Sequence, residues 1–223
     1  MQATSLSRQR WLTHLFLASL VSALYILIGL LFPAGKQGEI LLILLGYLSL
    51  LLVGVTLLIG PLNLLRQRRN PVNVDLRRDI GIWAGITGCW HVLLVLRGSL
   101  RDNRILFYFL RPGCCGGYTP LFTAYSLSND AGLFATLLLL LLLALSNTFS
   151  LRVLKGKRWK WLQRSTYVLL LLALAHTFGF QYLNLRGPLW IDAVLGLCAV
   201  VLVCQIWGIA TTLARRRRAH QHI

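Results

Sequence analysis

The sequence contains few charged residues, and very few of these are acidic. Only 13% of its 223 residues are charged, with 6 Asp and Glu against 23 Lys and Arg. The chain is 57% hydrophobic and has a mean hydropathy of +0.67. This composition excludes an ordinary soluble domain and indicates an integral membrane protein. Because the basic residues lie in short segments between apolar runs, they indicate membrane topology, and we expect no nucleic-acid partner.

The sequence also lacks the motifs of soluble redox modules. No GxGxxG fingerprint follows a strand, and the segments between apolar runs are too short to fold an FAD or NAD(P) domain. The five cysteines show no CxxC or zinc-type spacing. No acidic residue stands near the middle of an apolar run, where a transporter would typically carry one. Any electrons must therefore come from a separate partner or a lipid-soluble carrier.

Six apolar runs are long enough to cross a membrane, whose hydrocarbon core of about 30 Å needs roughly 20 helical residues. We therefore predict an all-α bundle of six transmembrane helices near residues 11–32, 39–60, 79–96, 131–149, 164–182 and 188–214. Residues 11–214 would form one domain, between a cytoplasmic segment at residues 1–10 and a basic cytoplasmic tail at residues 215–223. The third and fifth runs contain Gly, Thr and His, which is typical of helices that face a bundle interior.

The distribution of basic residues predicts the orientation. If the N-terminus is cytoplasmic, 17 of the 23 Lys and Arg lie on the inner side and six on the outer side. The positive-inside rule therefore places both termini in the cytoplasm. Membrane lipid is the first expected partner. A bacterial-type inner membrane is the expected location, and a thylakoid or organellar membrane stays open as an alternative.

Two histidines lie deep inside apolar runs, where an ionisable residue indicates function. His91 follows Asp79 by 12 residues and His176 follows Arg164 by 12, so each lies about 18 Å from the cytoplasmic end of its helix. The two imidazoles can therefore reach one level of a bundle and bind the iron of a planar heme from two sides. The alternative is a non-redox membrane protein, a small transporter or assembly factor, in which each histidine forms a structural hydrogen bond.

The residues around these histidines resemble a known family. The similarity covers about residues 60–176 and lies in the segments GPLNLLRQRRNPVNVDLRRDIGIWAGITGCWH, ALSN and RWKWLQRSTYVLLLLALAH. They resemble the ferric reductase-like transmembrane domain family, which includes ferric reductases, the membrane part of NADPH oxidases and the heme-binding subunit of bacterial methionine sulfoxide reductase systems. The resemblance implies a six-helix bundle with b-type heme between the third and fifth helices, and His91 and His176 as its axial iron ligands.

The sequence departs from this family pattern near the cytoplasmic side. Many members carry a second histidine on the fifth helix where WKWLQ places Gln163, and an amide is a poor heme ligand. Arg77 stands at the corresponding position of the third helix, as arginine does in the sulfoxide reductase subunit. We therefore expect one heme b and no clear ligand pair for a second. Arg77 and Arg78 would hold heme propionates, anchor the helix, or bind a quinone or flavin near Trp83.

These observations predict a transmembrane electron-transfer protein, either an oxidoreductase or the electron-transfer subunit of one. Electrons would pass from a quinol, a flavin or a separate cytoplasmic reductase to an outer acceptor. That acceptor would be ferric iron or a periplasmic reductase protein. The outer loop at residues 97–130 also holds Cys114 and Cys115, which either form a strained, easily reduced disulfide or stay unpaired.

Overall fold

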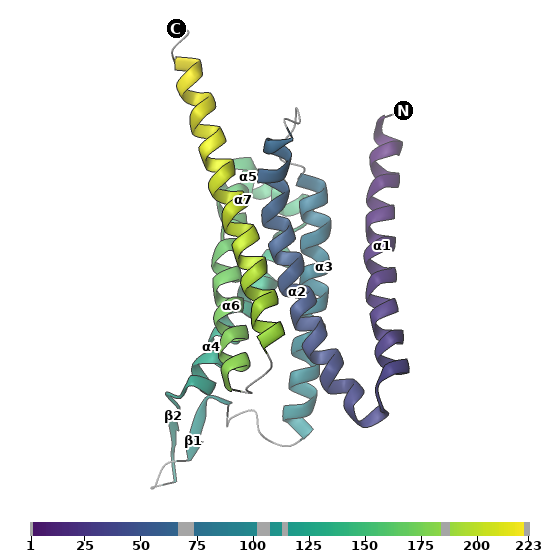
Figure 1. The fold of residues 1–223 in the computed structure, drawn as a ribbon, viewed down its shortest axis with the longest axis vertical. Coiled ribbons are helices and arrows are strands. Elements are labelled where there is room, and N and C mark those ends of the chain that lie inside the picture. Colours follow the sequence, from purple (N-terminus) through teal and green to yellow (C-terminus); the bar gives the residue numbers. More distant parts are fainter. Residues whose placement is uncertain (1, 67–73, 102–107, 113–115, 184–187, 221–223) are drawn as a thin grey trace.

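The structure is a computed structural model that describes residues 2–66, 74–101, 108–112, 116–183 and 188–220. Over these ranges the chain is almost entirely helical, with one short hairpin at an end of the helical bundle (Figure 1). In chain order the elements are α1 (Gln2–Leu31), α2 (Ala34–Leu65), α3 (Val74–Arg101), β1 (Leu110–Pro112), β2 (Tyr118–Pro120), α4 (Ala124–Leu145), α5 (Thr148–Gln163), α6 (Thr166–Leu183) and α7 (Pro188–His220).

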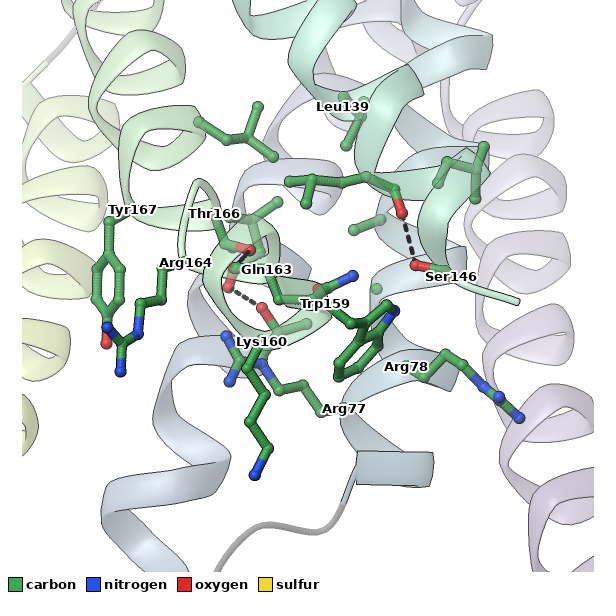
Figure 2. A pocket seen from close by; sticks show the side chains of 17 residues that line it. Arg77, Arg78, Leu139, Ser146, Trp159, Lys160, Gln163, Arg164, Thr166 and Tyr167 are labelled. Atoms are coloured by element: carbon green, nitrogen blue, oxygen red, sulfur yellow. Dashed lines mark hydrogen bonds between the residues drawn. The ribbon is translucent and has the colours of Figure 1, made fainter. Parts of the chain in front are cut away.

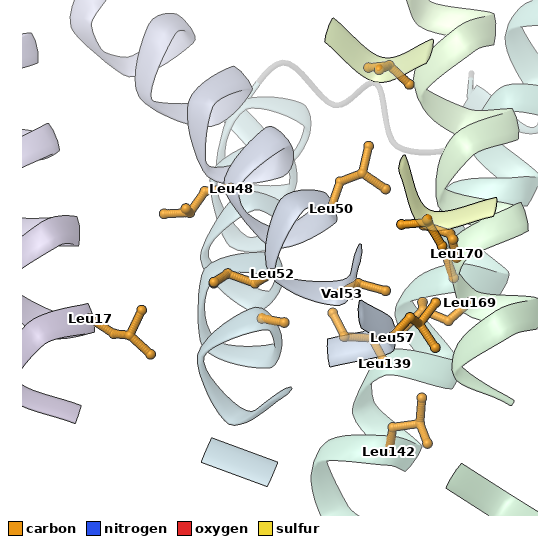
Figure 3. Close-up of a cluster of buried hydrophobic side chains, with 14 residues drawn as sticks. Leu17, Leu48, Leu50, Leu52, Val53, Leu57, Leu139, Leu142, Leu169 and Leu170 are labelled. Carbon is orange, nitrogen blue, oxygen red and sulfur yellow. The ribbon is translucent and has the colours of Figure 1, made fainter. Parts of the chain in front are cut away.

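Four helices form the centre of the bundle. α3 and α6 lie diagonally opposite each other, and each packs against both α2 and α4. The core between them consists of branched aliphatic side chains (Figure 3), among them Leu52, Val53, Leu57, Leu139, Leu142, Leu169 and Leu170. α7 packs along α2, while α1 contacts α2 and α3 from the outside. The diagonal arrangement means that side chains from α3 and α6 meet across the middle of the bundle.

The prediction of an all-α membrane protein is confirmed. Among the described residues, five helices are long and apolar enough to cross a membrane, namely α1, α2, α3, α4 and α7. The fifth predicted run corresponds to α6, which has 18 residues and packs against α2, α4 and α7. Both termini lie at the same end of the bundle (Figure 1). Six spans and a cytoplasmic location of that end stay predictions.

The terminal helices extend beyond the predicted apolar runs. α1 begins at Gln2, within the segment expected to precede the membrane domain, and α7 continues to His220, within the expected basic tail. Gln and Arg are good helix formers, so a helix that starts in an apolar run can continue into polar sequence. The length of an apolar run therefore gives the part of a helix that fits the hydrocarbon, and it underestimates the full length of that helix.

Two helix starts differ from the sequence prediction for the same local reason. α4 begins at Ala124 instead of residue 131, because Thr123 and Ser126 form a capping box in which each side chain binds the other's backbone N–H. α5 was not predicted as a helix. Asn147 caps it by accepting a hydrogen bond from the Ser150 backbone N–H at 2.7 Å. Short polar caps carry no hydropathy signal, so counting apolar residues missed both starts.

A two-stranded hairpin lies within residues 97–130, which were expected to form an outer loop. β1 and β2 pair antiparallel, with Leu110 opposite Pro120 and Pro112 opposite Tyr118. Cys114 and Cys115, the two cysteines expected in this loop, lie outside the described residues. The hairpin lies at the end of the bundle opposite the termini (Figure 1).

Pro61 breaks the hydrogen-bond pattern of α2. Proline has no backbone N–H, so the Leu57 carbonyl, four residues earlier, loses its partner within the helix. The Gln205 side chain of α7 donates its Nε2 to this carbonyl at 2.9 Å, and the Tyr167 hydroxyl of α6 donates to Gln205 Oε1 at 3.2 Å. An unpaired carbonyl is costly in hydrocarbon, and the hydrogen bond from Gln205 removes that cost. The two hydrogen bonds also connect α2, α6 and α7.

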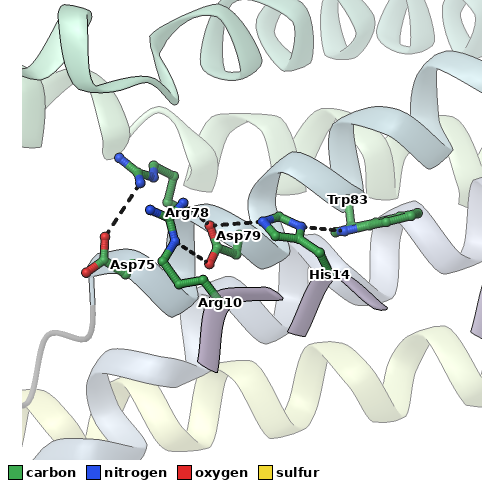
Figure 4. A network of polar contacts seen from close by, with 6 residues as sticks. All are labelled: Arg10, His14, Asp75, Arg78, Asp79 and Trp83. Atoms are coloured by element: carbon green, nitrogen blue, oxygen red, sulfur yellow. Dashed lines mark hydrogen bonds and ion pairs between the residues drawn. The ribbon is translucent and has the colours of Figure 1, made fainter. Parts of the chain in front are cut away.

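A buried carboxylate joins α1 to α3 (Figure 4). Asp79 is 1% exposed and accepts two hydrogen bonds from Arg10, from Nε at 3.0 Å and from Nη2 at 2.7 Å. His14 Nε2 lies 3.5 Å from the same carboxylate, and the Trp83 indole N–H donates to His14 Nδ1 at 3.0 Å. A carboxylate at this depth requires such partners, so the network fixes α1 against the bundle.

We expect Gln205→Leu to lower the free energy of unfolding by about 1 to 2 kcal/mol, because it leaves the Leu57 carbonyl without a donor. In a Pro61→Ala background the same substitution should have little effect, since the alanine N–H restores the helical hydrogen bond. Equilibrium unfolding in detergent would measure all four proteins of this cycle. An equal loss in both backgrounds would show that Gln205 stabilises the fold by another route.

We also expect Asp79→Asn to lower the free energy of unfolding by about 2 to 4 kcal/mol. This loss is smaller than the usual cost of breaking a fully buried ion pair, because Arg10 is partly exposed. The matched control is Asp75→Asn on the same helix. Asp75 is 51% exposed and lies 3.6 Å from Arg78, so its loss should cost less than about 1 kcal/mol. Thermal unfolding of the two variants in detergent tests the difference, and similar losses would contradict it.

Candidate functional site

His91 and His176 face each other across the centre of the bundle. Their ring centroids are 6.3 Å apart, and the ring planes are inclined at 82°. His91 lies on α3 and His176 on α6, the diagonal pair of helices, and both side chains are partly buried. The proximity predicted from their matched depth is therefore present in the structure.

Each imidazole is held by one hydrogen bond to the backbone of an adjacent helix. His91 Nδ1 lies 2.8 Å from the Leu42 carbonyl oxygen of α2, and His176 Nδ1 lies 2.8 Å from the Ser128 carbonyl oxygen of α4. A carbonyl oxygen only accepts, so Nδ1 carries the hydrogen in both rings. In the neutral imidazole this leaves the lone pair on Nε2, the arrangement of a histidine ready to bind a metal.

Two glycines make this approach to the backbone possible. Gly46 follows Leu42 by one helical turn, and a Cβ built on it would lie 3.0 Å from His91 Nδ1. Gly132 follows Ser128 by the same four residues, and a Cβ built there would lie 2.5 Å from His176 Nδ1. A side chain at position 132 would force the His176 ring to shift, and one at position 46 would press tightly against the His91 ring. The α2–α3 and α4–α6 pairs thus hold their histidines in the same way.

The two histidines suit a cofactor better than a bare metal ion. Among the described residues, no group of three or more His, Cys, Asp or Glu is placed to hold an ion, so two imidazoles would be the protein's whole contribution. Imidazole nitrogen lies about 2 Å from a bound transition metal and roughly 1 Å from its ring centre, so two rings on opposite sides of one metal have centroids roughly 6 Å apart. The observed separation matches this value, and a bound porphyrin would supply the remaining ligands.

Aromatic rings continue from His176 towards the hairpin end. The His176 and Phe180 centroids are 4.9 Å apart, Phe180 and Tyr125 are 5.5 Å apart, and Tyr125 and Tyr108 are 5.8 Å apart. The Ser99 and Tyr108 hydroxyl groups are joined by a hydrogen bond, with their oxygens 2.8 Å apart. This series of rings connects the centre of the bundle with the residues just before β1.

The other predicted site residues gather at a separate cavity near the α5 end. Arg77, Arg78 and Gln163 line this cavity of about 270 Å³ together with residues of α2, α4 and α6 (Figure 2). Arg77 precedes His91 by 14 residues, about 21 Å along α3, so the arginines are well removed from the imidazoles. Trp83, which was expected beside them, instead binds His14 of α1.

Several residues of the site were missed by the sequence analysis. The carbonyl groups of Leu42 and Ser128 leave no signal in a sequence, because every residue carries the same group. Gly46 and Gly132 do leave one. A glycine in an apolar helical run is destabilising and often marks a close approach of another group.

The chain was also compared with known proteins. A protein-family model described as ferric reductase like transmembrane component matches residues 45–174, which is more than half of the chain. The match includes His91 and ends two residues before His176. No curated protein and no solved structure matches the chain. The chain therefore belongs to the family of ferric reductase-like transmembrane components, in agreement with the resemblance around its two central histidines.

Proposed function

We propose that this protein transfers electrons across a membrane through one heme b, with His91 and His176 as the axial ligands of its iron. Membership of the family suggests a membrane electron-transfer role. The observation that carries the proposal is the 6.3 Å separation of two imidazoles whose Nδ1 atoms are both occupied by carbonyls. When bound, the heme supplies the one-electron iron couple that apolar side chains lack.

The protein's own contribution is to orient and tune the two imidazoles. The Leu42 and Ser128 carbonyls fix the tautomer and plane of each ring and raise the basicity of its Nε2. Gly46 and Gly132 bring those carbonyls close enough to act. The apolar surroundings lower the local dielectric and exclude water, which are two of the ways a protein sets a heme potential.

Donor and acceptor would approach opposite ends of the bundle. With α6 as the sixth span and the α5 end in the cytoplasm, a quinol, a flavin or a separate reductase would deliver electrons near Arg77 and Arg78. Ala84 and Leu169 line the cavity at that end, and each precedes its histidine by seven residues, about 10 Å along the helix. The outer acceptor, ferric iron or a periplasmic reductase, would approach the hairpin end. The protein would then be an oxidoreductase or the membrane subunit of one, in an inner membrane.

The structure offers support for one heme and not for two. The inner cavity is lined by Arg77 and Gln163 at the positions where an inner ligand pair would stand. A guanidinium that keeps its proton and a neutral amide are both poor ligands for iron. The inner cavity is therefore better suited to a donor than to a second heme b.

The alternative function is a non-redox membrane protein with structural histidines. The hydrogen bonds of His91 and His176 to neighbouring helices are what that alternative predicts. They use only one nitrogen of each ring, however, and they do not explain why two such rings should meet in the bundle centre. The ring-to-ring separation is the observation that favours heme ligation.

We expect the purified wild-type protein to contain one low-spin b-type heme per chain, and His91→Ala and His176→Ala each to abolish its spectrum, because each variant lacks one axial ligand. The measurement is the reduced-minus-oxidised visible spectrum with heme quantified per polypeptide. His14→Ala is the matched control, since His14 is bound to Asp79 and Trp83 outside the site. Well-folded wild-type protein without heme would overturn the proposal.

The two glycines give a graded test of the same site. Gly132→Ala should lower heme content several-fold, because its Cβ would lie 2.5 Å from His176 Nδ1 and displace the ring. Gly46→Ala meets His91 at 3.0 Å and should have a smaller effect. Gly196→Ala in α7, with open space around its Cβ, serves as the control. Equal heme content in the three variants would show that the ring positions do not matter for binding.

A further inference from the structure

The surface of α5 is strongly basic. The sequence contains no Asp or Glu between Asp130 and Asp192. Among the described residues, every ion pair involves α1 or α3, so no carboxylate of the described chain neutralises a charge on α5. All of the basic side chains of the helix are exposed, namely Arg152, Lys155, Lys157, Arg158 and Lys160.

Three large apolar side chains are exposed on the same helix. Phe149 is 74% exposed, Val153 61% and Trp161 70%. Phe149 follows Leu145, the last residue of the apolar span of α4, by four residues, so α5 begins at the edge of the hydrocarbon. Exposed aromatic and aliphatic side chains beside basic ones are typical of a helix that lies in the membrane interface.

α5 is divided into two short helical segments at Lys155. The Lys155 backbone has φ 54° and ψ 156°, which is a strained conformation for a residue with a side chain. The segments on either side, residues 148–154 and 156–163, are each only about two turns long. Helices of this length are not stable in isolation, so each segment needs contact with another surface.

Contact with α4 supports the second segment. The Trp159 side chain is 8% exposed, and its N–H donates to the Leu145 carbonyl at 3.1 Å. Trp161 comes two residues later and therefore lies on the opposite face of the helix. In the first segment, Phe149 and Val153 are one turn apart, so they share a face that the described protein leaves uncovered. A surface outside the chain is needed to cover these side chains.

We propose that α5 binds anionic phospholipid in the leaflet at its end of the bundle, which is also the end where both termini lie (Figure 1). Phe149, Val153 and Trp161 insert among the lipids, while the exposed lysines and arginines at positions 152–158 pair with lipid phosphates. None of these residues lines the inner cavity. Lipid binding by α5 therefore does not depend on heme ligation by His91 and His176, and the two proposals can fail separately.

An anionic lipid surface fits α5 better than an acidic protein does. Leu140 and Leu141 of α4 are 44% and 48% exposed, as expected of side chains that face lipid. The chain passes directly from these residues to α5, so lipid of the same leaflet is available to cover Phe149 and Val153. An acidic protein would match the charge of α5, but the exposed apolar side chains at the edge of the hydrocarbon require an apolar partner as well.

The experiment compares the full chain in nanodiscs of phosphatidylcholine with the full chain in nanodiscs that also contain phosphatidylglycerol. Amide hydrogen exchange of residues 148–163 is followed by mass spectrometry. Phosphatidylglycerol should slow this exchange by at least about threefold, because bound lipid stabilises two segments that are marginal alone. Added salt should reduce the effect, since it screens the attraction between exposed charges. Peptides from α3 serve as the internal reference.

Paired variants separate the charge of α5 from the total charge at this end of the bundle. Lys157→Gln/Arg158→Gln removes two charges from α5 and should abolish most of the protection by phosphatidylglycerol. Arg8→Gln/Arg217→Gln is the matched control, because it removes two exposed charges from α1 and α7. Thermal unfolding in phosphatidylcholine checks that both variants are folded.

A second pair tests the apolar contribution. Phe149→Ser keeps every charge of α5 and should reduce the protection by phosphatidylglycerol at least about twofold, because the inserted ring is lost. Phe122→Ser is the matched control, since Phe122 is 83% exposed and lies beside β2, at the hairpin end of the bundle.

Protection by phosphatidylglycerol that both α5 variants reduce and both controls retain supports the proposal. Equal exchange in the two kinds of nanodisc would overturn it. Equal losses in Lys157→Gln/Arg158→Gln and in its control would also overturn it, because the charge would then act from the whole end of the bundle. If Phe149→Ser leaves the protection unchanged, lipid insertion is wrong, and the result points to a partner that recognises charge alone, such as an acidic protein.

Discussion

The hydrogen bonds from two imidazoles to backbone carbonyls are the constraint on which the centre of this protein depends. Within hydrocarbon a polar ring must find a partner, and the carbonyls of Leu42 and Ser128 provide one for each histidine. Because each bond occupies Nδ1, the second nitrogen of each ring stays available for a metal. The same need for satisfied polar groups explains Gln205 beside Pro61 and Arg10 beside Asp79.

The positions of the two histidines could be predicted from the sequence, and their partners could not. Helical rise converts a count of residues into depth, so equal counts from Asp79 to His91 and from Arg164 to His176 predict one shared level. The helix α5 was not predicted because its many basic residues give it the low hydropathy that is typical of a loop. Its start depends on a single cap, Asn147, which hydropathy does not reveal. Which carbonyl an imidazole binds depends on packing between helices, and no residue type encodes it.

The two ends of the bundle differ in chemistry as well as in charge. At the α5 end, cationic side chains surround a cavity whose buried donors lack acceptors. At the hairpin end, aromatic rings lead from His176 to Tyr108. A protein that only anchored a partner would not need such different ends. In the proposed function, the donor would use the cationic end and the acceptor would use the end beyond the rings.

The parallel construction of the two halves has a consequence for biogenesis. α2 with α3, and α4 with α6, each carry one imidazole, one carbonyl and a glycine one turn later. Each half can orient its own ring as soon as its two helices associate, yet neither half contains a pair of rings. The two rings therefore come together only when the halves dock, so insertion of the proposed heme would follow that docking and would report on the final stage of assembly.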